Sequence, residues 1–209
     1  MRHLILLRHG QSEVNAAQQT QTIFCGQLDT PLTECGRQQA RDAGRILAGS
    51  PKYCISHAVS SSLGRASETL ELVIQQLQEP PFRFPASTGF NERSLGLFEG
   101  RQEQDVLAEF PEYRENPQFS AFRAHFHQKA PLGENLAEVT QRAHDELLRH
   151  VPHVTHDLLL VSHCQTIRCL IGVLTKAAPE SVMQFPVPNA TPIVLAQSGP
   201  DLWQLTNPD

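Results

Sequence analysis

Two histidines in this sequence follow short apolar runs, and an imidazole so placed can act as a nucleophile or exchange a proton. His9 comes after residues 4–7 and one arginine, and His163 comes after residues 158–161 and one serine. Each run has the length and composition of a strand buried on both faces. Ligands in open α/β sheets bind outside the carboxyl ends of strands. Two such strands side by side would therefore place both imidazoles in one crevice.

Polar groups that suit an anion lie near the first histidine. Arg8 precedes it, Gly10 permits a sharp turn or a close approach of the backbone, and Ser12 and Asn15 add short hydrogen-bonding side chains. Arg65 is expected where a strand passes into a helix, and a cation there opposes the helix dipole unless it serves an anion that the same helix end attracts. Taken alone, Arg65 is better explained as a solvent-exposed side chain.

Two carboxylates, Glu92 and Glu99, stand among glycines in a predicted loop. Either could act as a general acid if its environment kept it protonated. Most glutamates in loops are simply solvated, however. Spacing alone does not choose between these interpretations.

Strands and helices are predicted to alternate along the chain. Strands are predicted at residues 4–7, 55–60, 82–84 and 158–161, and a terminal hairpin at 192–196 and 202–205. Helices are predicted near residues 33–49, 66–77, 135–150 and 167–174. This alternation predicts an α/β fold, a three-layer sandwich whose mostly parallel sheet of about six strands has helices on both faces. Residues 14–29 are interpreted as a loop over the end of the first strand, where it could line a pocket.

The segment at about residues 101–132 has a different character, because aromatic residues are spread through polar sequence that two prolines interrupt. The aromatic residues are Phe110, Tyr113, Phe119, Phe122 and Phe126. We interpret this segment as a lid-like insertion within a single domain that spans residues 1–209. Its rings are expected to cover the core beneath them more than to form a pocket, although they also hint at an apolar or ring-bearing ligand.

Composition narrows the class of protein. The chain has 209 residues, 40% hydrophobic and 19% charged, with a formal net charge of −5. This balance argues against a general binder of nucleic acid or of anionic membranes. No apolar run approaches a membrane span, so we expect a cytoplasmic protein. The number of cysteines is odd, five, and they contain no Cys-x-x-Cys pair, so neither a disulfide framework nor a zinc site is expected. His150, His153 and His156 are not expected to bind a metal, because Pro152 interrupts the helical register that would align them.

Several sequence blocks, in the same order along nearly the whole chain, resemble those of the histidine phosphatase superfamily, also called the phosphoglycerate-mutase-like family. The blocks are residues 6–15, Pro31-Leu32-Thr33 with Gly36 and Gln39-Ala40, Ser60-Ser61 with Arg65-Ala66 and Glu68-Thr69, Gly133-Glu134-Asn135, and Val161-Ser162-His163 with Ile167-Arg168. The loop around Glu92 looks more like the phosphatase branch than the mutase branch. The resemblance implies the same α/β sandwich that the alternation predicts.

The resemblance also implies two groups of site residues. The catalytic group is His9, which becomes a phosphohistidine, Glu92, which donates the leaving-group proton, and His163. The phosphate-binding group is Arg8, Arg65, Asn15 and Cys164, the last through its backbone N–H. The neighbouring arginines should keep His9 neutral and match the phosphoryl oxygens with their forked donors. No metal or other cofactor is expected to take part.

Three positions depart from the family pattern. Cys164 stands where glycine is common after the second histidine, and its side chain could narrow the phosphate pocket. Gln11 replaces the commoner glutamate, and Ser62 stands where an acidic residue is frequent. None of these departures removes a catalytic group.

We therefore expect a metal-independent phosphomonoesterase of the histidine acid phosphatase type, which hydrolyses a small phosphorylated metabolite. The first alternative is a cofactor-dependent phosphoglycerate mutase, which passes the phosphoryl group to a second acceptor instead of water. The second is a non-catalytic phosphate-recognition module, although such a module would need neither a nucleophile nor a proton donor. The natural substrate and the oligomeric state are not predicted by the sequence.

Overall fold

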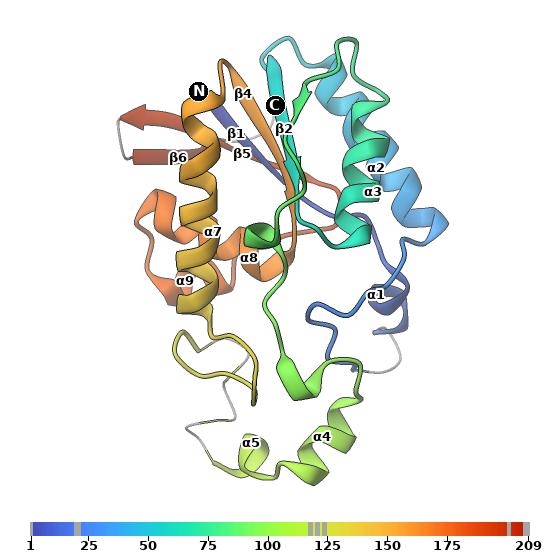
Figure 1. The fold of residues 1–209 in the computed structure, drawn as a ribbon, viewed down its shortest axis with the longest axis vertical. Coiled ribbons are helices and arrows are strands. Elements are labelled where there is room, and N and C mark those ends of the chain that lie inside the picture. Colours follow the sequence, from blue (N-terminus) through green and yellow to red (C-terminus); the bar gives the residue numbers. More distant parts are fainter. Residues whose placement is uncertain are drawn as a thin grey trace.

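In the computed structural model, which describes residues 2–18, 22–116, 119, 122, 125–199 and 202–206, a six-stranded sheet forms the centre of the molecule (Figure 1). Its strands are β1 (His3–Arg8), β2 (Ile55–Ser60), β3 (Phe82–Arg83), β4 (Asp157–Ser162), β5 (Pro192–Gly199) and β6 (Leu202–Thr206). The order across the sheet is β3-β2-β4-β1-β5-β6. The first four strands in this order are parallel, and β5 and β6 add the antiparallel terminal hairpin. The predicted α/β sheet is confirmed.

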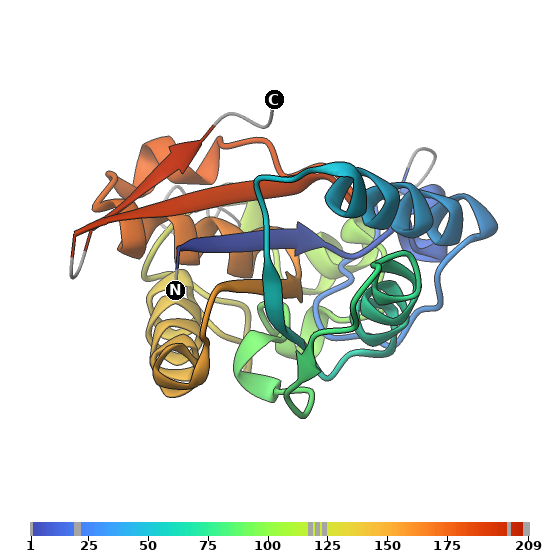
Figure 2. The same cartoon turned by 90° about the horizontal axis from the view of Figure 1, so that it is seen from above.

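Helices cover both faces of the sheet (Figures 1 and 2). On one face lie α2 (Glu34–Gly49) and α3 (Gly64–Ile74), and on the other lie α7 (Leu136–His150), α8 (Cys164–Thr175) and α9 (Pro179–Met183). The pleat of β1 divides its side chains accordingly, because Leu4 and Leu6 pack toward α7 and α8, whereas Ile5 and Leu7 pack toward α2 and α3. Burial on both faces explains why this strand is continuously apolar.

The register between β1 and β4 positions the two histidines. Leu4 pairs with Leu158, and the ladder continues in parallel to Arg8 and Ser162, the last residue of each strand. The backbone N–H of His9 then donates to the carbonyl of Ser162 over 3.0 Å, one residue beyond the strand. The two strands therefore end at the same level and bring both histidines to one edge.

Residues 14–29, interpreted above as a loop, begin with a short helix. Helix α1 (Glu13–Ala17) is held by a capping box in which the Ser12 hydroxyl accepts from the Asn15 N–H, while the Asn15 side chain accepts from the Ser12 N–H. This reciprocal pair satisfies two N–H groups at the helix start. The side chains of Ser12 and Asn15 thus stabilise the start of helix α1 and also line the site.

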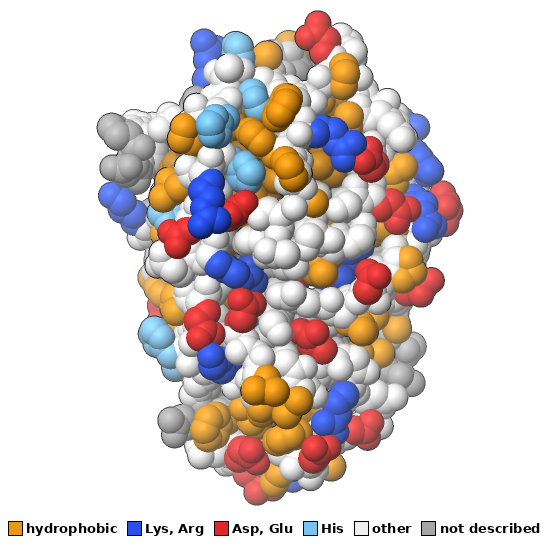
Figure 3. All heavy atoms as spheres, viewed as in Figure 1, with side chains coloured by type: hydrophobic (Ala, Val, Ile, Leu, Met, Phe, Trp, Pro, Cys, Tyr) orange, Lys and Arg blue, Asp and Glu red, His pale blue; other side chains and the backbone are white. Residues whose placement is uncertain are grey.

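The aromatic segment lies beyond the carboxyl edge of the sheet and contains α4 (Glu103–Glu109) and α5 (Glu112–Glu115) (Figure 1). It forms a separate apolar cluster of its own with Phe24 and Phe98, and its members are Phe24, Phe98, Val106, Tyr113, Phe122 and Ala130. Hydrophobic side chains also reach the surface of this part of the molecule (Figure 3). Among the described residues, none of the helices is long and apolar enough to cross a membrane.

Short 3₁₀ turns complete the path between these elements. They are η1 (Thr88–Phe90) and η2 (Gly96–Phe98), on either side of residues 91–95, which contain Glu92 and are called the carboxylate loop below, and η3 (Val151–His153) after α7. Gly96 has φ of 51°, and a Cβ there would lie 2.1 Å from the carbonyl oxygen of Pro131. Glycine is therefore needed where the carboxylate loop meets the end of the aromatic segment.

Candidate active site

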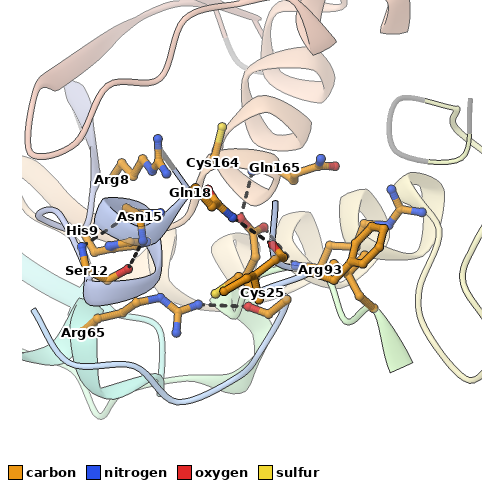
Figure 4. Close-up of a pocket in the computed structure, with 15 residues that line it drawn as sticks. Arg8, His9, Ser12, Asn15, Gln18, Cys25, Arg65, Arg93, Cys164 and Gln165 are labelled. Carbon is orange, nitrogen blue, oxygen red and sulfur yellow. Dashed lines mark hydrogen bonds between the residues drawn. The ribbon is translucent and has the colours of Figure 1, made fainter. Parts of the chain in front are cut away.

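A cavity of about 220 Å³ opens at the carboxyl edge of the sheet (Figure 4). Its lining residues come from β1, α1, the loop after it, α3, the carboxylate loop and the start of α8. Six of the seven residues that the sequence predicts for the site line it, namely Arg8, His9, Asn15, Arg65, Glu92 and Cys164. The seventh, His163, is fully buried behind this surface.

His9 is held with one ring nitrogen engaged. Its Nδ1 lies 2.7 Å from the carbonyl oxygen of Gly10, so Nδ1 carries the proton and donates it, and Nε2 keeps a lone pair. Burial, followed by the charges of Arg65 and Arg8, lowers the pKa of His9 from 6.5 to about 3. The ring is therefore a neutral nitrogen base near pH 7.

Two arginines flank this imidazole, and the described residues offer neither a carboxylate partner. Arg65 is only 2% exposed and donates through Nη1 to the carbonyl of Leu28 and through Nη2 to the carbonyl of Gly26. Arg8 donates through Nη1 to the carbonyl of Val187, and the Nε of each arginine has no partner. A buried charge without a counter-charge is costly. The cavity is therefore suited to an anion. Because Arg65 is buried, the prediction that it is a solvent-exposed side chain is wrong.

His163 packs directly against the first histidine. The two ring centroids are 5.1 Å apart at an interplanar angle of 54°. The Nε2 atom of His163 lies 2.6 Å from the hydroxyl of Ser61, and its Nδ1 atom is buried without a hydrogen-bond partner. Burial, and then the neighbouring His9, hold the pKa of His163 well below its usual value, so this ring is also neutral.

Glu92 is the carboxylate that the structure places in the cavity. Its side chain accepts from the backbone N–H of Arg93 over 2.9 Å and from that of Gln165 over 3.3 Å, and the Thr166 hydroxyl lies 3.4 Å away. The carboxylate is thus positioned between its own loop and the start of α8. Glu99 instead accepts hydrogen bonds from nearby loop groups and does not line the cavity.

Asn15 and Cys164 both line the cavity (Figure 4). The Oδ1 atom of Asn15 accepts from Ser12 and, over 3.3 Å, from the Asn189 side chain, which also donates to the carbonyl of His9 over 2.8 Å. Cys164 begins α8, whose N-cap residue His163 makes no side-chain cap, so the Cys164 N–H remains available to an anion, whereas the Gln165 N–H donates to Glu92. Sequence reasoning missed Asn189, because no local pattern connects it to a strand some 180 residues away.

The rest of the lining comes largely from residues that the sequence did not single out. They are Ser12, Gln18, Ile23, Phe24, Cys25, Gly26, Arg93, Leu95 and Gln165. Residues 23–26 confirm that the loop after the first strand lines a pocket. No described aromatic residue of segment 101–132 lines this cavity, so those rings give no support to an apolar or ring-bearing ligand here, and that expectation stays a prediction. Most of them pack on one another and on Phe24, and Phe126 packs on the core under α7 and α8.

Comparison with known proteins matches residues 4–207 to the model of the histidine phosphatase superfamily, branch 1. The chain belongs to this superfamily. A 2,3-bisphosphoglycerate-dependent phosphoglycerate mutase from Bradyrhizobium sp. strain BTAi1 is 32% identical to it over 196 residues, which cover 92% of this chain and 90% of that protein.

Solved structures of the superfamily are similar over almost the entire chain. A mycobacterial glucosyl-3-phosphoglycerate phosphatase, solved with VO3, has a TM-score of 0.79 and 26% identity, covering 99% of this chain and 98% of that one. The α-ribazole phosphatase from Shigella flexneri has a TM-score of 0.79 and 26% identity, covering 98% and 94%. Relatives in this histidine phosphatase superfamily are thus named as phosphatases and as mutases, which supports a phosphoryl-transfer enzyme.

Proposed function

We propose that this protein is a metal-independent phosphomonoesterase that hydrolyses a small phosphorylated metabolite through a phosphohistidine on His9. The observation that carries the proposal is a neutral, buried imidazole flanked by two guanidiniums, for which the described residues provide no carboxylate partner. A nucleophile must offer a lone pair, and a phosphoryl group must meet positive charge. In the cavity, Nε2 of His9 offers the lone pair and Arg8 and Arg65 beside it offer the positive charge.

The reaction takes two steps. The Nε2 lone pair of His9 forms a bond to phosphorus while the bond from phosphorus to the ester oxygen breaks, and protonated Glu92 gives its proton to the departing oxygen. Water then attacks the phosphohistidine, Glu92 takes a proton from that water, and the phosphorus–nitrogen bond breaks to release inorganic phosphate. One carboxyl group thus serves first as acid and then as base.

The remaining site residues bind the phosphoryl oxygens. Arg8 and Arg65 spread charge over them as the transition state develops, and the Asn15 side chain and the N–H of Cys164 donate further hydrogen bonds. His163 faces the reacting group from beside His9. Segment 101–132 serves as a lid-like insertion over the outer end of the cavity.

A phosphoglycerate mutase is the second candidate, because a curated relative at 32% identity carries that name. Its chemistry would begin with the same phosphohistidine and differ only in the acceptor, which would be a phosphoglycerate instead of water. A non-catalytic phosphate-recognition module fits the site less well, because binding alone requires neither His9 nor Glu92.

The test is hydrolysis of phenyl phosphate with EDTA present, combined with trapping of acid-labile label on the protein from a ³²P ester. We expect turnover and label in the wild type and the loss of both in His9→Ala. His156→Ala, which removes an exposed histidine near the opposite end of β1, is the control and should retain both. Transfer of label to a phosphoglycerate in preference to water would favour the mutase. Phosphate binding without label would favour the recognition module.

A further inference from the structure

The cavity has two chemically different ends. Arg8, His9 and Arg65 lie together at one end of it, and Arg93 lies at the other, outer end (Figure 4). Apart from the site residues and Arg93, the wall of the cavity is mainly apolar or neutral. It includes Gln18, Ile23, Phe24, Cys25, Leu95 and Gln165. The part of a substrate that lies beyond its phosphoryl group must contact this wall.

Arg93 is the cation of this outer end, and the backbone already engages its guanidinium. It donates through Nε to the carbonyl of Glu134 over 2.7 Å, through Nη1 to that of Phe122 over 3.0 Å, and through Nη2 to that of Gln128 over 2.8 Å. Two of its nitrogens hold the aromatic segment and the third holds Glu134 shortly after it, so Arg93 is used for structure. The described lining therefore directs no arginine or lysine toward a second anion.

The apolar wall is also rigid. The Phe24 ring lies 5.4 Å from the ring of Phe98 and 5.9 Å from that of Phe122, measured between centroids. Its backbone donates to the carbonyl of Arg101 and accepts from the N–H of Gly100. A wall that is packed and hydrogen-bonded from behind keeps its apolar surface available to a ligand without reorganisation.

We propose that the leaving group of the substrate is an uncharged alcohol with an apolar or ring-bearing face. The inference rests on the proposed function, since it concerns the alcohol released at Glu92. An ester that carries a second phosphate or a carboxylate would place an anion against Ile23, Phe24 and Leu95. The cation beside them, Arg93, already donates through each of its nitrogens to backbone carbonyls, so it compensates poorly for the lost hydration of that anion.

The experiment compares kcat/KM for phenyl phosphate and for 3-phosphoglycerate. We expect the wild type to favour phenyl phosphate by at least about tenfold, and Leu95→Arg to shift that ratio toward 3-phosphoglycerate by about tenfold or more. Leu97→Arg adds the same charge at an exposed position outside the cavity and should leave the ratio unchanged.

The outcomes separate this inference from the proposed function. Equal or better use of 3-phosphoglycerate by the wild type, with label on His9, would overturn the leaving-group inference and leave the phosphohistidine intact. An unchanged ratio in a folded Leu95→Arg protein would overturn it as well. Absence of label from both esters would contradict the proposed function itself.

A second inference comes from the hydrogen atoms around His163. The Ser61 hydroxyl, fully buried, lies 2.6 Å from Nε2 of His163 and accepts from the backbone N–H of Leu63 over 3.1 Å. If Nε2 donated to it, two buried groups would lack partners among the described residues, the hydroxyl hydrogen of Ser61 and the Nδ1 lone pair of His163. If the hydroxyl donates to Nε2, only one group lacks a partner, the Nδ1–H of His163. Each unsatisfied buried group is costly, so the second arrangement is favoured and the ring proton of His163 is on Nδ1.

We infer that Ser61 is a positioning residue that fixes this tautomer. The inference rests on the proposed function, because the Nδ1–H group of His163 then remains as a donor to the phosphoryl group bound at His9. Removal of the partners that orient metal-bound histidines typically changes affinity or activity by about 10- to 100-fold, and we expect a loss of the same order for this histidine. Ser61 itself need not touch the substrate.

Nitrogen-15 NMR of the full chain labelled at histidine distinguishes the tautomers, with the His163 signals identified by their loss in His163→Gln. We expect the Nδ1–H tautomer of His163 in the wild type and in Ser61→Thr. In Ser61→Ala we expect a mixture of the two tautomers and a kcat reduced by about tenfold or more. Ser67→Ala removes a neighbouring hydroxyl that donates to the Ser61 carbonyl and should keep both properties. Nε2–H in the wild type, or an unchanged tautomer in a folded Ser61→Ala protein, would overturn the inference.

Discussion

The carboxyl edge of β1 and β4 and the rings of the aromatic segment at 101–132 both gather unusual side chains, but they differ in what those side chains contact. At the sheet edge, the Nε atoms of Arg8 and Arg65 and the Nδ1 atom of His163 are buried without a partner. In the aromatic segment the rings contact one another, and the Tyr113 hydroxyl donates to the carbonyl of Lys129 over 2.8 Å. Rings that pack on one another form a core, whereas several buried nitrogens without partners around one cavity mark the place of a ligand.

Removing a ring from the aromatic cluster tests whether that cluster is a core. Phe98 is fully buried, and Phe98→Ala should lower the free energy of unfolding by about 3–5 kcal/mol, because the lost contacts leave a cavity. The kcat of the molecules that remain folded should change only a few-fold, within about 1 kcal/mol. Urea unfolding and single-temperature kinetics measure the two effects. Leu97→Ala, at a neighbouring exposed position, is the control.

Removing the charge of Arg65 from the carboxyl edge of the sheet tests whether that edge binds an anion. Arg65→Met should reduce kcat/KM for phenyl phosphate by about 10²–10³, because one guanidinium of the anion site is lost. Its thermal midpoint should fall far less than that of Phe98→Ala, since the guanidinium has no carboxylate partner among the described residues. Arg45→Met on the exposed face of α2 is the matched control. Retention of more than about a tenth of the activity would contradict the role proposed for Arg65.

A third test measures how the stability of the fold depends on pH through His9 at the carboxyl edge of the sheet. The pKa of His9 is about 3 in the folded protein and 6.5 in the unfolded chain, so below pH 6.5 the unfolded chain binds a proton that the folded protein does not. Stability should therefore be lost as pH falls from 6.5 toward 3, by about 1.4 kcal/mol per pH unit for this group. His163, whose pKa is also lowered, adds to the same trend.

Urea unfolding from pH 7 to pH 4 in wild type and His9→Asn measures this contribution. The variant should show a shallower loss of stability with acidity, because asparagine does not titrate. His156→Asn should behave like the wild type. An identical slope in His9→Asn would mean that His9 is protonated in the folded protein.

The smallest expected effect concerns Leu132, which lies at the end of the aromatic segment. It has φ of 60° and is 84% exposed, so its side chain gains little from packing while its backbone is in the left-handed region. Leu132→Gly should raise the free energy of unfolding by about 0.5 kcal/mol, and Leu132→Ala should give no such gain. A loss of stability in Leu132→Gly, measured by urea unfolding, would mean that this leucine packs on a neighbour.

The sequence alone determined the fold class and the place of the site. Continuous apolar runs identify β1 and β4 as doubly buried strands, and Arg8, His9 and His163 follow directly from where those strands end. The capping pattern around Asn135 likewise predicts α7, whose capping box the structure contains. These features depend on short-range patterns, and a parallel sheet converts them into proximity because its strands end at one edge.

Only the tertiary structure decided which polar groups are satisfied. Glu92 and Glu99 look alike in sequence, yet one reaches the cavity while loop N–H groups hold the other. The burial of Arg65, the contact between Ser61 and His163, and the apolar wall of Ile23, Phe24 and Leu95 also join segments far apart in the chain. Such contacts depend on the exact approach of packed elements, and spacing along the chain does not encode whether a buried atom finds a partner.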